Sequence, residues 1–196
     1  YSGGKEYDKL KNKAITVQEQ TDDSGDDSGD TFKVDFDVLL QENPDTVAWI
    51  RFDEPSIISY PVVKSADNKE YLTKTFSAND NKLGAIFMDM RNTSDFSDKN
   101  TMIYGHNMKN GSMFNNIKSY TDQSFADEHP YVYIYLPDGT VSQYKVVVGH
   151  IISEISSLYG TNNDMDKSSF IQEMVKTSSI KVDFDQSQVQ SVITLS

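Results

Sequence analysis

The amino-acid sequence predicts a mainly β fold, a closed or nearly closed barrel of about seven to eight short strands with N-terminal helices and one helix inserted late. Aromatic residues are abundant, chiefly 11 Tyr and 10 Phe, and many stand in alternating runs typical of half-buried strands. Short apolar runs are separated by Gly, Pro and Asp turn residues. With 196 residues, the chain can form one domain with a proper core and an appendage.

Residues 1–30 are predicted to be an N-terminal helix and an acidic Gly/Ser/Asp linker, preceding a barrel domain of residues 31–196. Within residues 5–20, apolar side chains recur at the spacing of one helical face: Tyr7, Leu10, Ala14 and Val17. Residues 21–30 are small or acidic and cannot bury apolar area, so we expect a mobile linker or loop. A calcium site is disfavoured there, because the twelve-position loop pattern and its terminal Glu are absent.

The elements of the barrel domain follow from periodicity and turn residues. We expect strands over residues 47–52, 57–63, 84–89, 101–106, 131–136, 141–152 and 189–195. The clearest hairpin joins residues 131–136 to 141–152 through Pro137, Asp138 and Gly139. Helical spacing predicts helices or helical turns over residues 35–42, 67–73, 113–129 and 166–177.

Composition excludes several classes of function. The net charge of −12, from 30 acidic against 18 basic residues, would repel nucleic-acid phosphates, so we expect no nucleic-acid partner. The chain has no cysteine, which excludes disulfides and thiolate metal sites within it. No apolar run reaches the roughly 20 residues of a membrane helix. No phosphate loop or other cofactor motif is present, and we predict neither a cofactor nor a metal.

Three histidines are candidates for proton transfer, and one stands out. His129 precedes a proline at an expected helix-to-strand junction, where a surface or capping role is favoured. His150 follows an apolar run and is expected to be a strand residue with a satisfied hydrogen bond. His106 closes a buried-looking strand and is followed by a loop, the position at which rigid scaffolds present functional groups. A serine nucleophile stays open, although no serine is singled out by its sequence context.

Several segments, taken in order, resemble class B sortases. The segment 104–107 (Tyr-Gly-His-Asn) resembles their Tyr-Gly-His segment, and the terminal Thr-Leu-Ser of residues 194–196 resembles the opening of their Thr-Leu-x-Thr-Cys motif. Residues 166–177 resemble the helix that this class inserts between its sixth and seventh strands. The resemblance covers about residues 32–196, and further matching stretches are residues 43–50, 60–63, 67–72 and 86–89.

The resemblance implies a sortase-like barrel and a cysteine transpeptidase. Sortases cleave a sorting pentapeptide of Asn-Pro-Gln-Thr-Asn or Leu-Pro-x-Thr-Gly type after Thr, form a thioester, and pass the acyl group to an amine of peptidoglycan or its lipid-linked precursor. His106 would be the general acid and base. The implied location is the extracellular face of a Gram-positive cell membrane, reached through an N-terminal anchor absent from this sequence.

The same resemblance points to five substrate-binding candidates: Asn68, Leu72, Tyr104, Tyr159 and Ser196. Ser196 has an independent argument, because it lies two residues before the expected cysteine and strand side chains alternate. Each of the five could equally be core or rim. The spatial hypothesis behind the assignment is that the end of the chain runs beside the His106 strand.

Two departures from the family pattern accompany the resemblance. The nucleophilic cysteine is missing, and the two arginines of the sequence, Arg51 and Arg91, do not match the family's arginine position. We expect the cysteine and the arginine strand to follow Ser196 in a longer chain. Two alternatives stay open: a non-catalytic surface β-barrel that binds peptide or cell-wall polymer, and a serine hydrolase that uses His106.

Overall fold

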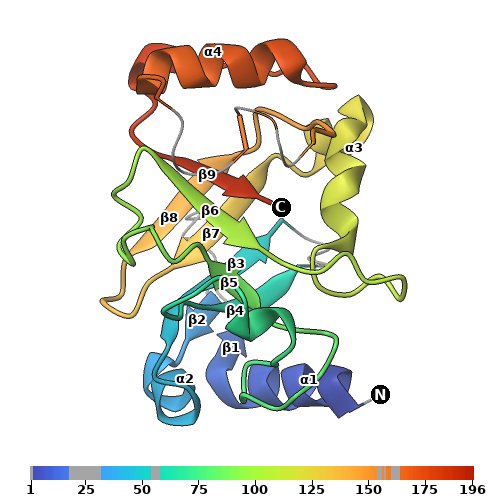
Figure 1. Cartoon of the computed structure of the whole chain (residues 1–196), viewed down its shortest axis with the longest axis vertical. Coiled ribbons are helices and arrows are strands. Elements are labelled where there is room, and N and C mark those ends of the chain that lie inside the picture. The colour runs from blue at the N-terminus through green and yellow to red at the C-terminus, as the bar shows by residue number, and fades with distance from the viewer. Residues whose placement is uncertain (1, 18–31, 54–57, 154–155, 157, 160–163) are drawn as a thin grey trace, which may run out of the picture.

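A computed structural model describes residues 2–17, 32–53, 58–153, 156, 158–159 and 164–196. Its centre is a curled seven-stranded sheet with the strand order β8-β7-β3-β4-β5-β6-β9 (Figure 1). This architecture confirms the predicted mainly β fold. The strands are β3 (Thr46–Phe52), β4 (Ser59–Val63), β5 (Ile86–Met88), β6 (Asn100–Tyr104), β7 (Tyr131–Tyr135), β8 (Val141–Lys145) and β9 (Val192–Leu195).

The strand β3 organises the core. It pairs antiparallel with β4 on one side and with β7 on the other, and six of its seven residues are buried. Trp49 and Ile50 are fully buried there, because a central strand is covered on both faces. The other half of the sheet contains both parallel pairings, β4 with β5 and β6 with β9, while β5 and β6 are antiparallel.

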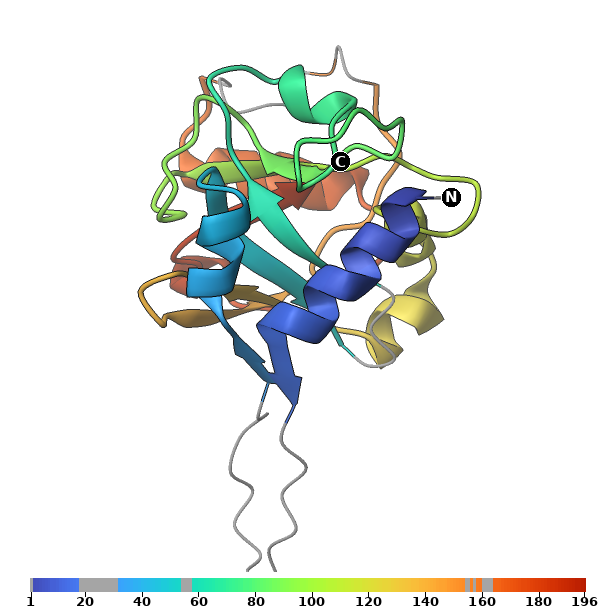
Figure 2. The same ribbon diagram turned by 90° about the horizontal axis from the view of Figure 1, so that it is seen from below.

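Helices cover the two ends of the sheet. In Figure 1, α4 (Lys167–Thr177) lies beyond β9, whereas α1 (Ser2–Ala14) and α2 (Phe36–Glu42) lie at the opposite end. Figure 2 is seen from the side of α1 and α2. Two predicted helices begin where the sequence indicates, because Asp35 and Asp166 cap α2 and α4 with hydrogen bonds from backbone N–H groups.

The N-terminal helix ends earlier than its apolar periodicity predicts. Residues 5–20 were expected to be helical, but α1 ends at Ala14 and β1 (Ile15–Val17) pairs antiparallel with β2 (Phe32–Val34). Ile, Thr and Val are β-branched, so they favour a strand once a partner strand is available. Val17 is consequently exposed instead of continuing the helical face.

The helix α1 packs on the main core. Tyr7, Leu10 and Ala14, three of the four predicted face residues, are buried in the same cluster as the residues of β3 and β4. The acidic stretch of residues 21–30 lies outside the described residues. The division at residues 30 and 31 therefore stays a prediction.

Two long predicted elements are interrupted. The predicted helix 113–129 is a 3-10 helix η2 (Asn115–Thr121) followed by α3 (Gln123–Glu128), because Asp122 adopts an extended backbone and caps α3 by accepting from Phe125 N. The predicted strand 141–152 ends at Lys145. Its partner β7 begins at Tyr131, so the residues after Lys145 have no β7 residue left to pair with.

Candidate functional site

His106 lies just beyond the buried strand β6. The strand ends at Tyr104, two residues earlier than the sequence predicts, and its first four residues are buried. The Nε2 atom of His106 lies 2.6 Å from the carbonyl oxygen of Leu72. Because a carbonyl only accepts, this contact places the ring proton on Nε2. The His106 carbonyl in turn accepts from Phe114 N at 3.0 Å, which fixes the loop that follows.

The ring of His106 is seated against Gly84. A Cβ at Gly84 would lie 2.8 Å from His106 Cδ2, 2.7 Å from Tyr71 O and 3.0 Å from Leu72 O. Gly84 also has a φ of +63°, which favours glycine. The histidine and its carbonyl partner therefore approach a turn that tolerates no side chain. The 3-10 helix η1 (Glu70–Leu72) supplies the Leu72 carbonyl.

The end of the chain runs beside the histidine strand, as the spatial hypothesis predicts. Strand β9 pairs in parallel with β6, with Leu195 opposite Ile103. Ser196 N donates to Ile103 O at 3.0 Å, and Gly105 N donates to Ser196 O at 2.9 Å. Ser196 is thus hydrogen-bonded to the residue that precedes His106.

Tyr159 and Ser196 meet, although 37 residues separate them in sequence. Their hydroxyl oxygens are 2.9 Å apart, and both residues are partly buried. Leu72 is 40% exposed and offers an apolar side chain next to the carbonyl that holds His106. The structure therefore places the Leu72 carbonyl against the His106 ring and Ser196 against Gly105, with Tyr159 hydrogen-bonded to Ser196.

Asn68 and Tyr104 converge on a residue that the sequence analysis did not assign, Asp89. Its carboxylate is fully buried, and Oδ2 accepts from the Tyr104 hydroxyl at 2.7 Å and from Asn68 Nδ2 at 3.0 Å. Arg91 NH2 also donates to Oδ2, at 2.8 Å, and Arg91 Nε donates to Oδ1 at 2.9 Å. The side-chain oxygen of Asn68 accepts from Met90 N at 2.7 Å. The side chains of Asn68 and Tyr104 are therefore hydrogen-bonded to other residues of the chain.

The ionisation of this network follows from its contacts. Burial by itself raises the pKa of Asp89, but hydrogen bonds from Arg91 and Tyr104 outweigh it and hold the pKa well below its usual range. Burial, together with the hydrogen bond to this carboxylate, raises the pKa of Tyr104. Asp89 is thus an anion and Tyr104 a neutral donor. The sequence signal for Asp89 and Arg91 is an Asp-x-Arg directly after the buried strand β5.

The chain is similar to known proteins in sequence and in structure. No family model matches the chain. It is 34% identical to sortase B of Listeria monocytogenes over 166 residues, which are 81% of this chain and 64% of that protein. A crystal structure of a Bacillus anthracis protein similar to sortase B covers all of the chain and 89% of its own, with 28% identity and a TM-score of 0.79. A Staphylococcus aureus sortase B–substrate complex covers 82% of this chain and 74% of its own, with 28% identity and a TM-score of 0.74.

The chain belongs to the class B sortase family. It spans less than two thirds of the Listeria protein's length. No cysteine is present in its 196 residues.

The two arginines bind other side chains of the described residues. Arg51 is buried, its guanidinium donates to the Tyr135 hydroxyl at 2.8 and 3.1 Å, and it stacks on the rings of Phe32 and Tyr133. Arg91 binds Asp89 as described.

The other two histidines have structural contacts. His129 forms the C-cap of α3, as the capping interpretation predicts, and its ring packs at a tilt against Phe125 with centroids 4.6 Å apart. His150 is not in a strand, because β8 has already ended. Its Nδ1 lies 2.8 Å from Thr177 Oγ1, and burial lowers its pKa.

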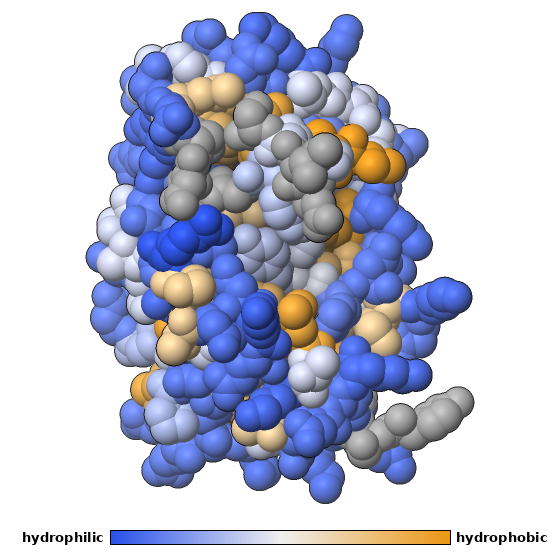
Figure 3. Space-filling view, in the orientation of Figure 1, coloured by the Kyte–Doolittle hydropathy of each residue, from blue (hydrophilic) through white to orange (hydrophobic). Residues whose placement is uncertain are grey.

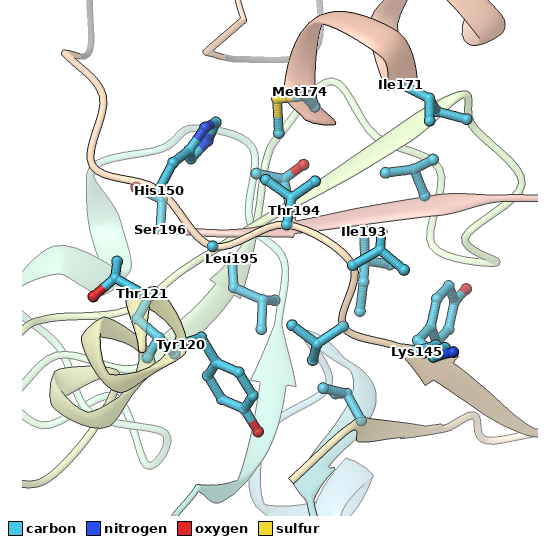
Figure 4. A pocket seen from close by; sticks show the side chains of 18 of the residues that line it. Tyr120, Thr121, Lys145, His150, Ile171, Met174, Ile193, Thr194, Leu195 and Ser196 are labelled. Atoms are coloured by element: carbon cyan, nitrogen blue, oxygen red, sulfur yellow. The ribbon is translucent and has the colours of Figure 1, made fainter. Parts of the chain in front are cut away.

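A cavity of about 730 Å³ opens between the edge strands β8 and β9. Figure 3 shows this face hollowed near its centre, with apolar side chains inside a hydrophilic surround. Ile193 and Leu195 line it from β9, Met174 from α4 and Lys145 from β8, and Ser196 is also a lining residue (Figure 4). The sortase-family chain thus presents a wide apolar recess beside its C-terminal strand.

The described residues contain neither a candidate metal site nor a membrane-spanning helix. No group of three or more His, Cys, Asp or Glu side chains there could hold a metal ion. None of the helices in those same segments is long and apolar enough to cross a bilayer.

Proposed function

We propose that this chain provides the histidine-bearing part of a sortase-type cysteine transpeptidase, which cleaves a sorting pentapeptide after Thr and joins the acyl group to an amine. The observation that carries the proposal is the pairing of β9 with β6, which brings Ser196 to Gly105, next to His106. On a strand, the residue two positions after Ser196 shares its face. A cysteine there would lie on the same side as the Ser196 side chain.

The proposed reaction has two steps. A cysteine thiolate attacks the Thr carbonyl carbon, a C–S bond forms, and the C–N bond breaks as His106 gives a proton to the leaving amine. An acceptor amine then attacks the thioester, His106 takes its proton, and the thiolate leaves. The Leu72 carbonyl and Gly84 fix the orientation of the imidazole for both transfers. The 196 residues hold no cysteine, so the thiol comes from residues outside this sequence in the proposed enzyme.

The recess between the edge strands β8 and β9 is the proposed position of the arginine-bearing strand. Among the described residues β9 pairs only with β6, and the recess beside it is apolar. An unpaired edge beside uncovered apolar residues is an unfavourable arrangement. We propose that an arginine-bearing strand following the cysteine covers this recess and supplies a donor for the developing oxyanion.

The proposed partners are a sorting-signal peptide and a cell-wall amine. Staphylococcus aureus sortase B has been solved with a substrate and, separately, with Gly3, which supports a peptide and an amine as the two reactants. Leu72, Tyr159 and Ser196 are the proposed peptide contacts, and Asn68 and Tyr104 are proposed to shape the groove through Asp89. Peptidoglycan or its lipid-linked precursor as acceptor, and an N-terminally anchored position at the extracellular face of the membrane, are part of the same proposal.

The test extends the chain past Ser196 with Thr-Cys and an arginine-bearing strand, and measures cleavage of a library of sorting peptides. We expect thiol-dependent cleavage, abolished when the added cysteine is changed to Ala. His106→Ala is expected to lower kcat by about 10²–10⁴-fold, while His129→Ala, in a histidine with a structural role, serves as the matched control. No cleavage of any peptide by a folded extended chain would contradict the proposal.

A non-catalytic peptide-binding module is the second candidate, favoured by the absence of cysteine and by the apolar recess. Calorimetric titration of the 196-residue chain with sorting peptides separates the two. Binding by this chain, combined with an extended chain that never forms a thioester detectable by mass spectrometry, would favour the binding module over the transpeptidase.

A further inference from the structure

The helix α1 contacts the segment of residues 75–84, which follows η1 and ends at Gly84. The ring of His106 lies against this glycine. From the first turns of α1, the Glu6 carboxylate accepts from Ser77 N and from the Thr75 hydroxyl, both at 2.9 Å. Gly3 packs so closely that an added Cβ would lie 2.9 Å from Leu83. The segment is therefore fixed against the helix at both of its ends.

Tyr7 makes the contact that reaches Gly84 itself. Its side chain is 3% exposed, and its hydroxyl donates to the Gly84 carbonyl at 2.9 Å while accepting from Phe76 N at 3.3 Å. Both hydrogen-bond partners, Gly84 O and Phe76 N, are backbone atoms of residues 75–84. A buried carbonyl that loses such a donor has no access to water in exchange, so the hydroxyl holds the position of Gly84.

Gly84 transmits that position to the histidine. The ring of His106 and the carbonyls of Tyr71 and Leu72 all lie within 3.0 Å of where a Gly84 Cβ would be. Ala85 N, the next residue, donates to Tyr71 O at 3.0 Å, and Leu72 O is the partner of His106 Nε2. A shift of Gly84 would thus move both the surface on which the ring rests and the carbonyl that orients it.

A second contact of Tyr7 leads to the other side of His106. The Tyr7 ring packs edge-on against Tyr60, with centroids 5.4 Å apart and planes at 87°. The Tyr60 hydroxyl accepts from Met113 N at 3.1 Å, and Met113 pairs with Asn107, the residue after His106. Tyr7 therefore supports the histidine through the turn before it and through the loop after it.

We infer that α1 is a positioning element of the site and that Tyr7 is a positioning residue, which sets the orientation of the His106 imidazole through Gly84. The catalytic consequence rests on the proposed function, whereas the positioning itself does not. Tyr7→Phe removes one hydroxyl and keeps the ring, so it disconnects α1 from Gly84 while the core stays filled.

The experiment reads the His106 tautomer from imidazole 15N signals of the 196-residue chain at alkaline pH, with His106→Gln used for assignment. We expect the Nε2–H form to dominate in the parent chain, because Nε2 contacts the Leu72 carbonyl. Tyr7→Phe is expected to change the ratio of the two tautomers by at least about twofold. Gly84→Ala, which acts on the ring directly, is the positive control.

Tyr120→Phe is the matched control. Tyr120 is also a buried residue, and its hydroxyl donates to a backbone carbonyl, that of His129 at 2.8 Å, but it has no described contact with His106 or Gly84. A tautomer ratio that changes only in Tyr7→Phe supports the inference, and equal ratios in Tyr7→Phe and the parent overturn it. In the extended chain, Tyr7→Phe is expected to lower kcat by about tenfold with little change in KM. If the tautomer shifts while no variant cleaves peptide, the proposed function fails and the positioning stands.

Discussion

The strands β6 and β9 are parallel neighbours, yet their surroundings differ sharply. Four of the five residues of β6 are buried, and its exit is held by Asp89, Gly84 and the Leu72 carbonyl. All four residues of β9 are only partly buried, and its outer side faces the cavity. Hydrogen bonds between described residues therefore organise the end of β6 that leads to His106. The C-terminal edge is open to a further element.

The largest expected difference concerns the paired residues Ile103 and Leu195. Ile103→Ala is expected to lower the free energy of unfolding by about 3–4 kcal/mol, because it leaves a cavity in a fully buried site. Leu195→Ala should cost only about 1–2 kcal/mol, because Leu195 already faces an open recess. Urea denaturation of the two variants measures both values. Equal losses would mean that β9 is covered as well as β6 is.

The second-largest effect is expected in the buried polar network around Asp89. Asp89→Asn is expected to lower the free energy of unfolding by about 2–3 kcal/mol at neutral pH, because a buried anion with charged and neutral donors is replaced. The folded-state pKa of Asp89 lies below its unfolded value of about 4. Its contribution is therefore complete above that value and is lost as the pH falls toward the folded pKa.

Denaturation of parent and variant at pH values from neutral to about 3 tests this dependence. The stability gap between parent and Asp89→Asn should narrow as the pH falls. Asp138→Asn, in an exposed turn, is the control and should change the acid dependence far less. A gap that stays constant across this range would show that the Asp89 carboxylate contributes no proton linkage.

The smallest effect is expected at the C-terminal edge. Tyr159→Phe removes the hydroxyl contact with Ser196, and we expect a loss of less than about 1 kcal/mol because both groups are partly exposed. Tyr104→Phe, which removes the hydroxyl that donates to the buried Asp89, is its matched counterpart and should cost more. Thermal unfolding of the two variants makes the comparison. A larger loss in Tyr159→Phe would reverse the proposed contrast between the two regions.

Local patterns predicted most of the fold. The strands around Trp49, Ile86 and Met102, the hairpin at Gly139 and the helices α2 and α4 follow from alternation, turn residues and helical spacing. The errors occurred where a partner decided the outcome. Ile15 to Val17 became a strand because β2 was available, and residues after Lys145 left the sheet because β7 had no further residues to pair.

The site residues likewise fall into those that the sequence could identify and those that depended on distant partners. His106 was a candidate from the sequence because it follows a buried strand, and the resemblance to class B sortases implied that the end of the chain lies beside that strand. Arg91 lies two residues from Asp89, but Tyr104 lies 15 residues away, and Gly84 lies 77 residues from Tyr7. Sequence alone therefore did not select Asp89 or Tyr7 for the site. Nothing local to either residue states which hydroxyl or carbonyl it will meet.

The sequence by itself determined a mainly β domain of the sortase type, a candidate histidine and the absence of a thiol within these 196 residues. Such properties reside in periodicity, residue type and order, which exist before the chain folds. Only the tertiary structure decided that the His106 ring lies against Gly84, that Asp89 binds Asn68 and Tyr104, and that α1 reaches Gly84 through Tyr7. The physical reason is that hydrogen bonds and close contacts between distant segments form only when packing has brought those segments together.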